Sequence, residues 1–184
     1  RNIARGRETI AYPDREKEPE KYLSVCYSMP QWLAEHFRAA YGTDACEKIL
    51  AASLERQPVC LRLKEGMARE ERARLIAAWE AEGVTVREHP YHPCAVTVQG
   101  AAGIRKLAGY AEGLFAVQDA SSILAVEAAG IKPGDTVIDV CAAPGGKALH
   151  AAQKAGKDGT VIACDVSGYK TDQIEENRRR LGAE

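Results

Sequence analysis

The fold of this chain is decided by the stretch Asp139-Val140-Cys141-Ala142-Ala143-Pro144-Gly145-Gly146-Lys147. It joins an expected strand over 136–140 to an expected helix over 147–155. Small residues and two glycines allow a ligand to approach the backbone closely. The free N–H groups at the start of the following helix favour an anionic group. The stretch therefore predicts a ligand site that holds a carboxylate on this loop.

An acidic residue follows the next expected strand, which covers 160–164. Asp165 stands about 20 residues after the glycines, where Rossmann-type sites place an acid that accepts hydrogen bonds from ribose hydroxyls. The glycine loop and this acid together predict a ligand that carries ribose, with its adenosine beside Asp165.

Other interpretations of the loop fit less well. A dinucleotide site requires G-x-G-x-x-G, and this loop lacks that spacing. A P-loop requires G-x-x-x-x-G-K-[ST], but Cys141 stands at its first glycine and Ala148 at its hydroxyl residue. A plain strand–helix turn would explain Gly145 and Gly146 alone, but not the whole string followed by Asp165.

Outward from the loop, the sequence indicates two kinds of structure. From Leu114 onward strands and helices alternate and the strands are apolar, which predicts an α/β fold with a parallel sheet. Before it, residues 28–100 alternate helical and strand patterns in a compact α+β arrangement. The helices are expected to begin near Ser28, Asp44 and Ala68, and the strands to cover 58–63, 84–86 and 95–98.

These patterns predict three segments. Residues 1–27 carry charges of alternating sign, and Pro13 and Pro19 interrupt any helix, so we expect a charged lead-in or linker. Residues 28–112 are expected to form the α+β unit and residues 113–184 the α/β part. The sequence begins with arginine rather than methionine, which suggests a piece of a longer protein.

Composition excludes several classes of protein. Of the 184 residues, 46% are hydrophobic and 28% are charged, which excludes a mainly disordered chain. The formal net charge is −1, so a strongly basic nucleic-acid binder is excluded, although a local basic surface is not. No apolar run approaches the ~18 residues of a membrane span, and no signal peptide opens the sequence. The six cysteines form no C-x-x-C pair, so we expect free thiols in a cytoplasmic protein with no membrane partner.

The segment from Asp139 to Lys147 resembles motif I of the Nol/Nop/Sun family of RNA cytosine-C5 methyltransferases, whose usual form is D-x-C-A-A-P-G-G-K-T. The segment from Gly113 to Ser122 is similar to the family's G-x-x-x-x-Q-D-x-x-S motif. The segment from Asp165 to Gly182, including Asn177, is similar to its motif II. Tyr12-Pro13-Asp14 and the stretch from Tyr22 to Leu33 resemble the bacterial Sun-type branch, which modifies 16S ribosomal RNA.

The resemblance implies an architecture and a function. It implies a small α+β N1 domain over 28–112 that helps to seat ribosomal RNA. A Rossmann-like methyltransferase domain that uses S-adenosylmethionine would follow, and residues 113–184 would be its N-terminal part.

The resemblance also implies which residues bind the cofactor. Asp165 would bind the ribose hydroxyls, Val166 would flank the adenine, and Asp119 would support the loop. Lys170 stands where the family commonly has arginine, and Ala148 where it has threonine. The methionine part of the cofactor would lie on Cys141, Ala142, Ala143, Pro144, Gly145, Gly146 and Lys147. We expect the side chain of Cys141 to pack rather than to act as a nucleophile.

The family's mechanism implies that the chemistry lies elsewhere. A cysteine thiolate attacks C6 of cytosine, and a second cysteine helps to release the product. These cysteines belong to later motifs, whereas this sequence ends at Glu184, and neither Cys94 nor Cys164 lies in a matching context. We therefore expect no catalytic residue here and no RNA methylation by this polypeptide alone. We also expect the truncated sheet to associate through its apolar edge.

RNA contacts are expected from basic side chains, namely Arg62, Lys64, Arg105 and Lys106. A solvated helix face that carries ion pairs explains the neighbouring charges over 69–80 equally well. His89 and His92 with one nearby thiol are too few to indicate a metal site, so we expect none. Two other functions stay open: a non-catalytic RNA-binding module that keeps the cofactor fold, and a nucleotide-dependent oxidoreductase, against which the missing G-x-G-x-x-G counts.

Overall fold

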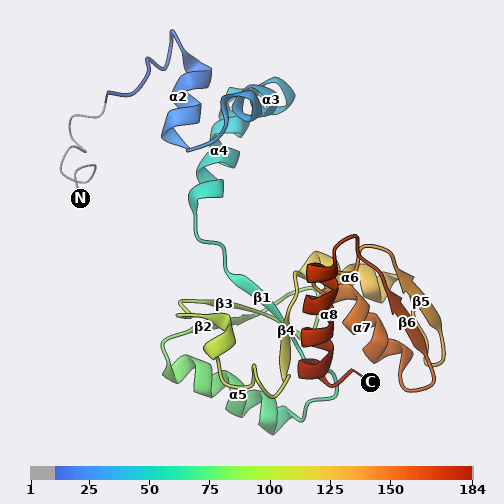
Figure 1. Ribbon diagram of the computed structural model, residues 1–184. Coiled ribbons are helices and arrows are strands. Elements are labelled where there is room, and N and C mark those ends of the chain that lie inside the picture. Colours follow the sequence, from blue (N-terminus) through green and yellow to red (C-terminus); the bar gives the residue numbers. More distant parts are fainter. Residues whose placement is uncertain (1–10, 184) are drawn as a thin grey trace. The chain divides into compact units, whose positions relative to one another are not determined.

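The structure, a computed structural model, describes residues 11–183 (Figure 1). The first ten residues of the expected lead-in lie outside the described residues. The chain forms two compact units, of which the first ends at Gln57 and the second begins at Pro58. This division differs from the boundaries at 28 and 113 that the sequence pattern suggested.

The first unit is helical. It contains α2 (Pro19–Cys26), α3 (Gln31–Tyr41) and α4 (Thr43–Leu54). Its small core consists of Leu23, Ala34, Cys46 and Leu50. The expected linker over 1–27 is therefore wrong for residues 19–26. Pro19 stands in the first turn of α2, where a missing N–H costs no hydrogen bond, and Leu23 is buried in the core.

The second unit opens with a four-stranded antiparallel sheet. Its strands are β1 (Val59–Leu63), β2 (Thr85–Glu88), β3 (Ala95–Gln99) and β4 (Phe115–Val117), in the order β2-β3-β1-β4. Helix α5 (Arg69–Ala81) follows β1, and the short 3₁₀ helix η2 (Ile104–Lys106) precedes β4. Because β4 pairs with β1, the segment after residue 113 completes this sheet before the parallel part begins.

Strand β1 is buried on both faces. Leu61 and Leu63 pack with Trp79 of α5 in the main core of the unit. Cys60, which precedes Leu61, packs on the opposite face with Ile123 of α6 (Ala120–Ala128). Successive side chains of a strand point to opposite faces, so the residue between Leu61 and Leu63 is directed toward the α6 side.

The remaining elements alternate as predicted. Strand β5 (Thr136–Asp139) pairs in parallel with β6 (Thr160–Ala163). Helix α7 (Gly146–Ala155) connects them, and α8 (Gly168–Leu181) follows β6. The α/β fold class is confirmed. One face of this two-stranded sheet carries the exposed side chains of Ile138 and Ile162. Association through its edge stays a prediction.

Helix α8 is fixed to the segment that precedes β4. The Arg180 guanidinium donates to the carbonyl oxygens of Tyr110 and Phe115 at 3.0 and 2.9 Å. It also lies 4.1 Å from the centre of the Tyr110 ring, which is a cation–π distance. Gly113 has φ +69°, and a Cβ there would lie 2.1 Å from the Arg180 carbonyl oxygen. Only glycine allows this close approach of two backbones.

None of the helices among the described residues 11–183 is long and apolar enough to cross a membrane.

Replacing Gly113 by alanine is expected to destabilise the second unit through this clash. Gly156 is the matched control because it has φ +68° but nothing within 4 Å of an added Cβ. Gly156→Ala should cost about 1 kcal/mol of left-handed strain. Gly113→Ala should cost about 2 kcal/mol more, as steric overlaps in packed regions do. Urea unfolding of both variants measures the difference, and equal unfolding free energies would contradict the described packing.

Candidate functional site

The pairing of β5 with β6 continues into the glycine loop. The Cys164 N–H donates to the Asp139 carbonyl at 2.8 Å, and the Ala142 N–H donates to the Cys164 carbonyl at 2.9 Å. The two chain segments therefore leave the sheet side by side. The structure brings the loop over 139–147 and Asp165 together at the carboxyl edge of the parallel strands.

The Asp165 carboxylate contacts the loop directly. It accepts hydrogen bonds from the Ala143 N–H at 3.1 Å and from the Val166 N–H at 2.8 Å. The Lys170 ammonium lies 3.4 Å from Oδ1, and the carboxyl side chain is only 7% exposed. Partial burial alone would raise the pKa of Asp165, but the two N–H donors and Lys170 outweigh it and hold this pKa below its usual range. The carboxylate thus stays charged and can accept further hydrogen bonds.

Gly145 shapes the turn that begins α7. Its φ is +104°, and its N–H donates to the Ala142 carbonyl at 2.7 Å. A Cβ at this position would lie 3.0 Å from the Leu149 side chain. Among residues 11–183, no side chain caps the amino end of α7. The N–H groups of its first turn are therefore free to receive an anionic group.

Two further side chains hold the loop. Asn177 of α8 donates to the Pro144 carbonyl at 3.0 Å. The Gln118 side chain, which is almost fully buried, packs against Gly146, where an added Cβ would lie 3.8 Å from its Cγ. The sequence placed both residues within motifs but predicted neither contact. Their partners are far away along the chain, so no local pattern reveals them.

The structure corrects the expectation for the thiols of the site. All six cysteines are free, as expected. Cys141, however, is exposed rather than packed, and Cys164 is exposed as well. Both follow the ends of β5 and β6, where the described chain offers no third parallel strand to cover them. Val166 is 97% exposed, so its side chain is open to a ligand.

The candidate RNA residues divide into two groups. Lys64 is exposed, as are Arg105 and Lys106 on η2. Arg62 is 2% exposed, and its guanidinium is hydrogen-bonded to Gln118 and Gln153. Including Arg62 was therefore wrong, because strand alternation turns it toward α6 and α7 rather than toward solvent.

A cavity of about 420 Å³ adjoins the loop on the side of α8. The backbone of Pro144, Gly145 and Gly146 forms part of its wall. Ala116, Val117 and Leu149 supply apolar surface, and Arg105, Gln173 and Asn177 supply polar groups. Neither Asp165 nor Val166 lines it, so the ribose position expected from the sequence lies outside this cavity.

The sequence matches two family profiles. Residues 29–105 match a profile described as "Methyltr_RsmF/B-like, ferredoxin-like domain". Residues 127–184 match one described as "16S rRNA methyltransferase RsmB/F". Together the profiles cover β1, β2 and β3 of the antiparallel sheet and the glycine loop, whereas β4 lies between the two matched ranges.

Curated relatives carry corresponding names. The chain is 35% identical to "Ribosomal RNA small subunit methyltransferase B" of Cronobacter sakazakii, over 83% of this chain and 34% of the relative. It is 34% identical to "Probable ribosomal RNA small subunit methyltransferase B" of Bacillus subtilis, over 96% of this chain and 39% of the relative. The chain therefore spans little more than a third of the length of these relatives.

Solved structures share the fold. The structure titled "Crystal Structure of PH0851" matches with a TM-score of 0.79 and 27% identity, over 95% of this chain and 39% of that chain. A structure of NSun6 from Pyrococcus horikoshii, solved with SFG, matches with a TM-score of 0.71 and 20% identity, over 84% of this chain and 63% of that chain.

The environment of Asp165 leads to a prediction about its ionisation. Its pKa, measured by carboxyl-detected NMR, should lie below the ~3.9 of an unperturbed aspartate. Lys170→Met should raise that pKa, whereas Lys157→Met, which changes an exposed lysine, should not. Because the folded pKa is below the unfolded one, this carboxylate stabilises the fold at neutral pH and loses that effect as the pH falls through the folded pKa. A folded-state pKa equal to that of the unfolded chain would contradict the described contacts.

Proposed function

Because this chain belongs to the RsmB/F family of 16S rRNA methyltransferases, we propose that its glycine loop binds S-adenosylmethionine. The methionine carboxylate would lie on the free N–H groups at the start of α7, and the ribose hydroxyls would donate to Asp165. Val166, which is exposed beside Asp165, would lie against the adenine. S-adenosylmethionine supplies the methyl group of the reaction.

One observation carries this proposal. The Asp165 carboxylate is held charged at the same sheet edge as the loop, by two backbone N–H donors and the Lys170 ammonium. Oδ2 accepts one hydrogen bond from a described residue, which leaves it a further acceptor position. A ribose diol pairs well with such a carboxylate. The NSun6 structure titled with SFG, an analogue of S-adenosylmethionine, supports the same cofactor.

The substrate we propose is 16S ribosomal RNA, which would place this activity in the cytoplasm. The exposed cations Lys64, Arg105 and Lys106 could contact its phosphates. Such contacts add affinity without reading the base sequence. We propose cytosine C5 as the atom that the whole protein methylates, on the strength of the Nol/Nop/Sun motifs over 113–182.

We propose that the chain by itself binds cofactor and RNA but leaves cytosine unmodified. C5 methylation requires a thiolate that attacks C6, and no cysteine of this chain stands in the family's catalytic context. The base would therefore be attacked by residues in the rest of the whole protein. Transfer of a labelled methyl group to ribosomal RNA by this chain alone would contradict that assignment.

The runner-up function is an RNA-binding module that keeps the cofactor fold without using it. The exposed cations on the antiparallel sheet side would suit it equally well. The two functions differ in one property, since only the methyltransferase requires saturable cofactor binding at Asp165.

Calorimetric titration with S-adenosylhomocysteine tests the proposed site. The wild-type chain should bind one equivalent. Asp165→Asn keeps an oxygen that can accept from Ala143 but loses the charge. It should bind roughly 10- to 100-fold more weakly, the value of one charge-assisted hydrogen bond. Asp158→Asn, which changes an exposed aspartate in a turn, is the control. Equal affinity of the Asp165→Asn variant would contradict the site, and no binding by the folded wild type would favour the runner-up.

The RNA surface is tested through its dependence on salt. Removing both cations of η2 in Arg105→Ala/Lys106→Ala should reduce the slope of log affinity against log salt by about 1.4, or about 0.7 for each lost phosphate contact on single-stranded RNA. Filter binding with a fragment of 16S rRNA measures the slope. Lys157→Ala should leave the slope unchanged. An unchanged slope in the double variant would exclude η2 from the RNA surface.

A further inference from the structure

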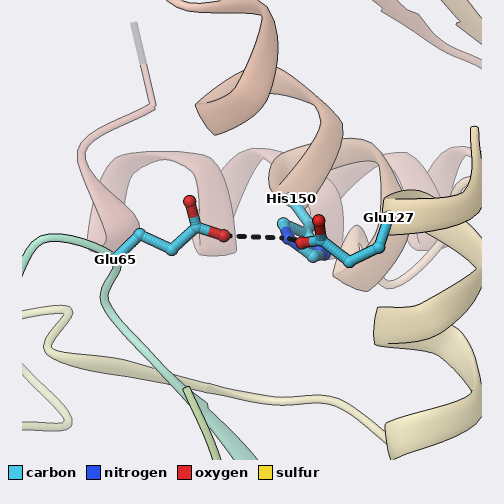
Figure 2. A group of neighbouring side chains, drawn as sticks. All are labelled: Glu65, Glu127 and His150. Carbon is cyan, nitrogen blue, oxygen red and sulfur yellow. Dashed lines mark hydrogen bonds and ion pairs between the residues drawn. The ribbon is translucent and has the colours of Figure 1, made fainter. Parts of the chain in front are cut away.

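A cluster of ionic side chains lies between the antiparallel sheet and α7. Figure 2 shows the carboxylates of Glu65 and Glu127 converging on His150. Glu65 stands in the turn after β1, Glu127 belongs to α6 and His150 to α7. We call this cluster, together with Arg62 and Lys154, the buried network.

Two nitrogens alternate with two oxygens at its centre. His150 Nε2 lies 3.3 Å from Glu65 Oε1 and 3.2 Å from Glu127 Oε1. Lys154 Nζ lies 3.1 and 2.8 Å from the same two oxygens. The His150 side chain is fully buried, and the other three are a quarter to a third exposed. The network thus joins three elements through one set of close contacts.

Arg62 connects the network to the cofactor loop. Its Nε donates to Gln118 Oε1 at 2.7 Å, and its Nη1 donates to Gln153 of α7. Gln118 in turn packs against Gly146, the first residue of α7. The buried guanidinium therefore fixes both the side chain that supports the loop and the helix that begins there.

One face of α7 carries all of these contacts. Gly146, His150 and Lys154 follow one another at intervals of four residues, a spacing that places them on the same helix face. Since a helix of ten residues moves as a rigid unit, contacts at His150 and Lys154 determine the rotation and axial position of Gly146.

The charges of the network balance. The cations Arg62 and Lys154 oppose the carboxylates of Glu65 and Glu127. Burial, and next the Arg62 charge, lower the pKa of His150 to about 4, although both carboxylates act to raise it. His150 is therefore neutral at neutral pH. Because carboxylates only accept hydrogen bonds, its Nε2 carries the proton.

Two more titratable groups face this cluster. His92, in the loop before β3, has its Nε2 3.3 Å from Glu127 Oε1. Cys94 lies close enough to interact with the charges of Arg62 and Glu65, and burial is the main cause that raises the pKa of its thiol. Both groups belong to the antiparallel sheet side, and neither lies on α7.

A metal ion is the obvious alternative occupant. Ligand atoms of Glu65, Glu127 and His150 lie within 4.8 Å of one another. However, the Lys154 ammonium already contacts both carboxylates. A metal on Nε2 would also leave the buried Nδ1–H of His150 without an acceptor among residues 11–183, whereas metal-bound histidines almost always have one. The geometry favours an ion-pair network.

We propose that the buried network positions the cofactor loop, with Lys154 as the positioning residue that holds the carboxylates of Glu65 and Glu127 against α7. This inference rests on the proposed cofactor function. None of these side chains needs to touch the cofactor, because the network acts through the placement of Gly146 and Gln118.

Lys154 can be replaced by a neutral side chain or by another cation. In Lys154→Met, two carboxylates face a neutral His150 without a cation between them, which favours displacement of α7. Lys154→Arg keeps a positive charge at this position, since arginine stays protonated in proteins. It should therefore hold both carboxylates and keep the placement of α7.

The test is calorimetric titration of the 184-residue chain with S-adenosylhomocysteine at neutral pH. Lys154→Met should bind roughly 3- to 30-fold more weakly than wild type, a typical range for indirect positioning. Lys154→Arg, which keeps the cation, should bind like wild type. The control Lys157→Met, which changes an exposed lysine, should also bind like wild type.

The outcomes separate this inference from the proposed function. If folded wild type binds no S-adenosylhomocysteine, both fail. If wild type binds and folded Lys154→Met binds equally well, or if folded Lys154→Arg binds as weakly as Lys154→Met, only the positioning role fails. Circular dichroism establishes that each variant is folded. Should Lys154→Met not fold, Glu65→Gln keeps the Lys154–Glu127 pair, and unchanged affinity in that variant would also overturn the proposal. Zn²⁺ binding to wild type that Glu127→Gln removes would overturn it in favour of a metal site.

Discussion

The hydrogen bond from the Ala143 N–H to the Asp165 carboxylate determines the shape of the candidate site. Parallel pairing of β5 and β6 brings the two chain segments to one edge, and this bond then holds them together beyond the last ladder contacts. The same carboxylate that would bind ribose thus helps to form the loop that would bind the methionine carboxylate. A change of the Asp165 carboxylate would therefore affect both the shape of the loop and the contact with ribose.

The second unit is built around β1. One face of this strand forms the core with α5, and the other face is covered by α6 and contributes Arg62 to the side of α7. The antiparallel sheet and the start of the parallel sheet consequently share buried groups. These shared groups explain why one compact unit contains both sheets instead of ending at residue 113. In the role proposed for the buried network, they would also connect the ferredoxin-like part to the glycine loop.

The sequence predicted most of the elements around the site. Local patterns sufficed for β5, α7, β6 and the glycine turn, because strand alternation, helix periodicity and Gly145 each act over a few residues. The burial of Arg62 was not predictable in this way. A strand with alternating apolar residues is read as having one solvated face, and only the three-dimensional arrangement reveals that α6 and α7 cover the other. The network of Glu65, Glu127 and His150 was missed for the same reason, since its members lie up to 85 residues apart.

The most direct measurement of the central claim is an amide NMR titration of this chain with S-adenosylhomocysteine. Saturable shifts are expected for the backbone amides over 141–147, apart from Pro144, and for those of Asp165 and Val166, at the carboxyl edge of β5 and β6. Smaller changes are expected for Tyr110 and Gln173, which line the adjoining cavity away from Asp165. Saturable shifts confined to the cavity residues, with Asp165 and Val166 unmoved, would contradict this placement of the cofactor.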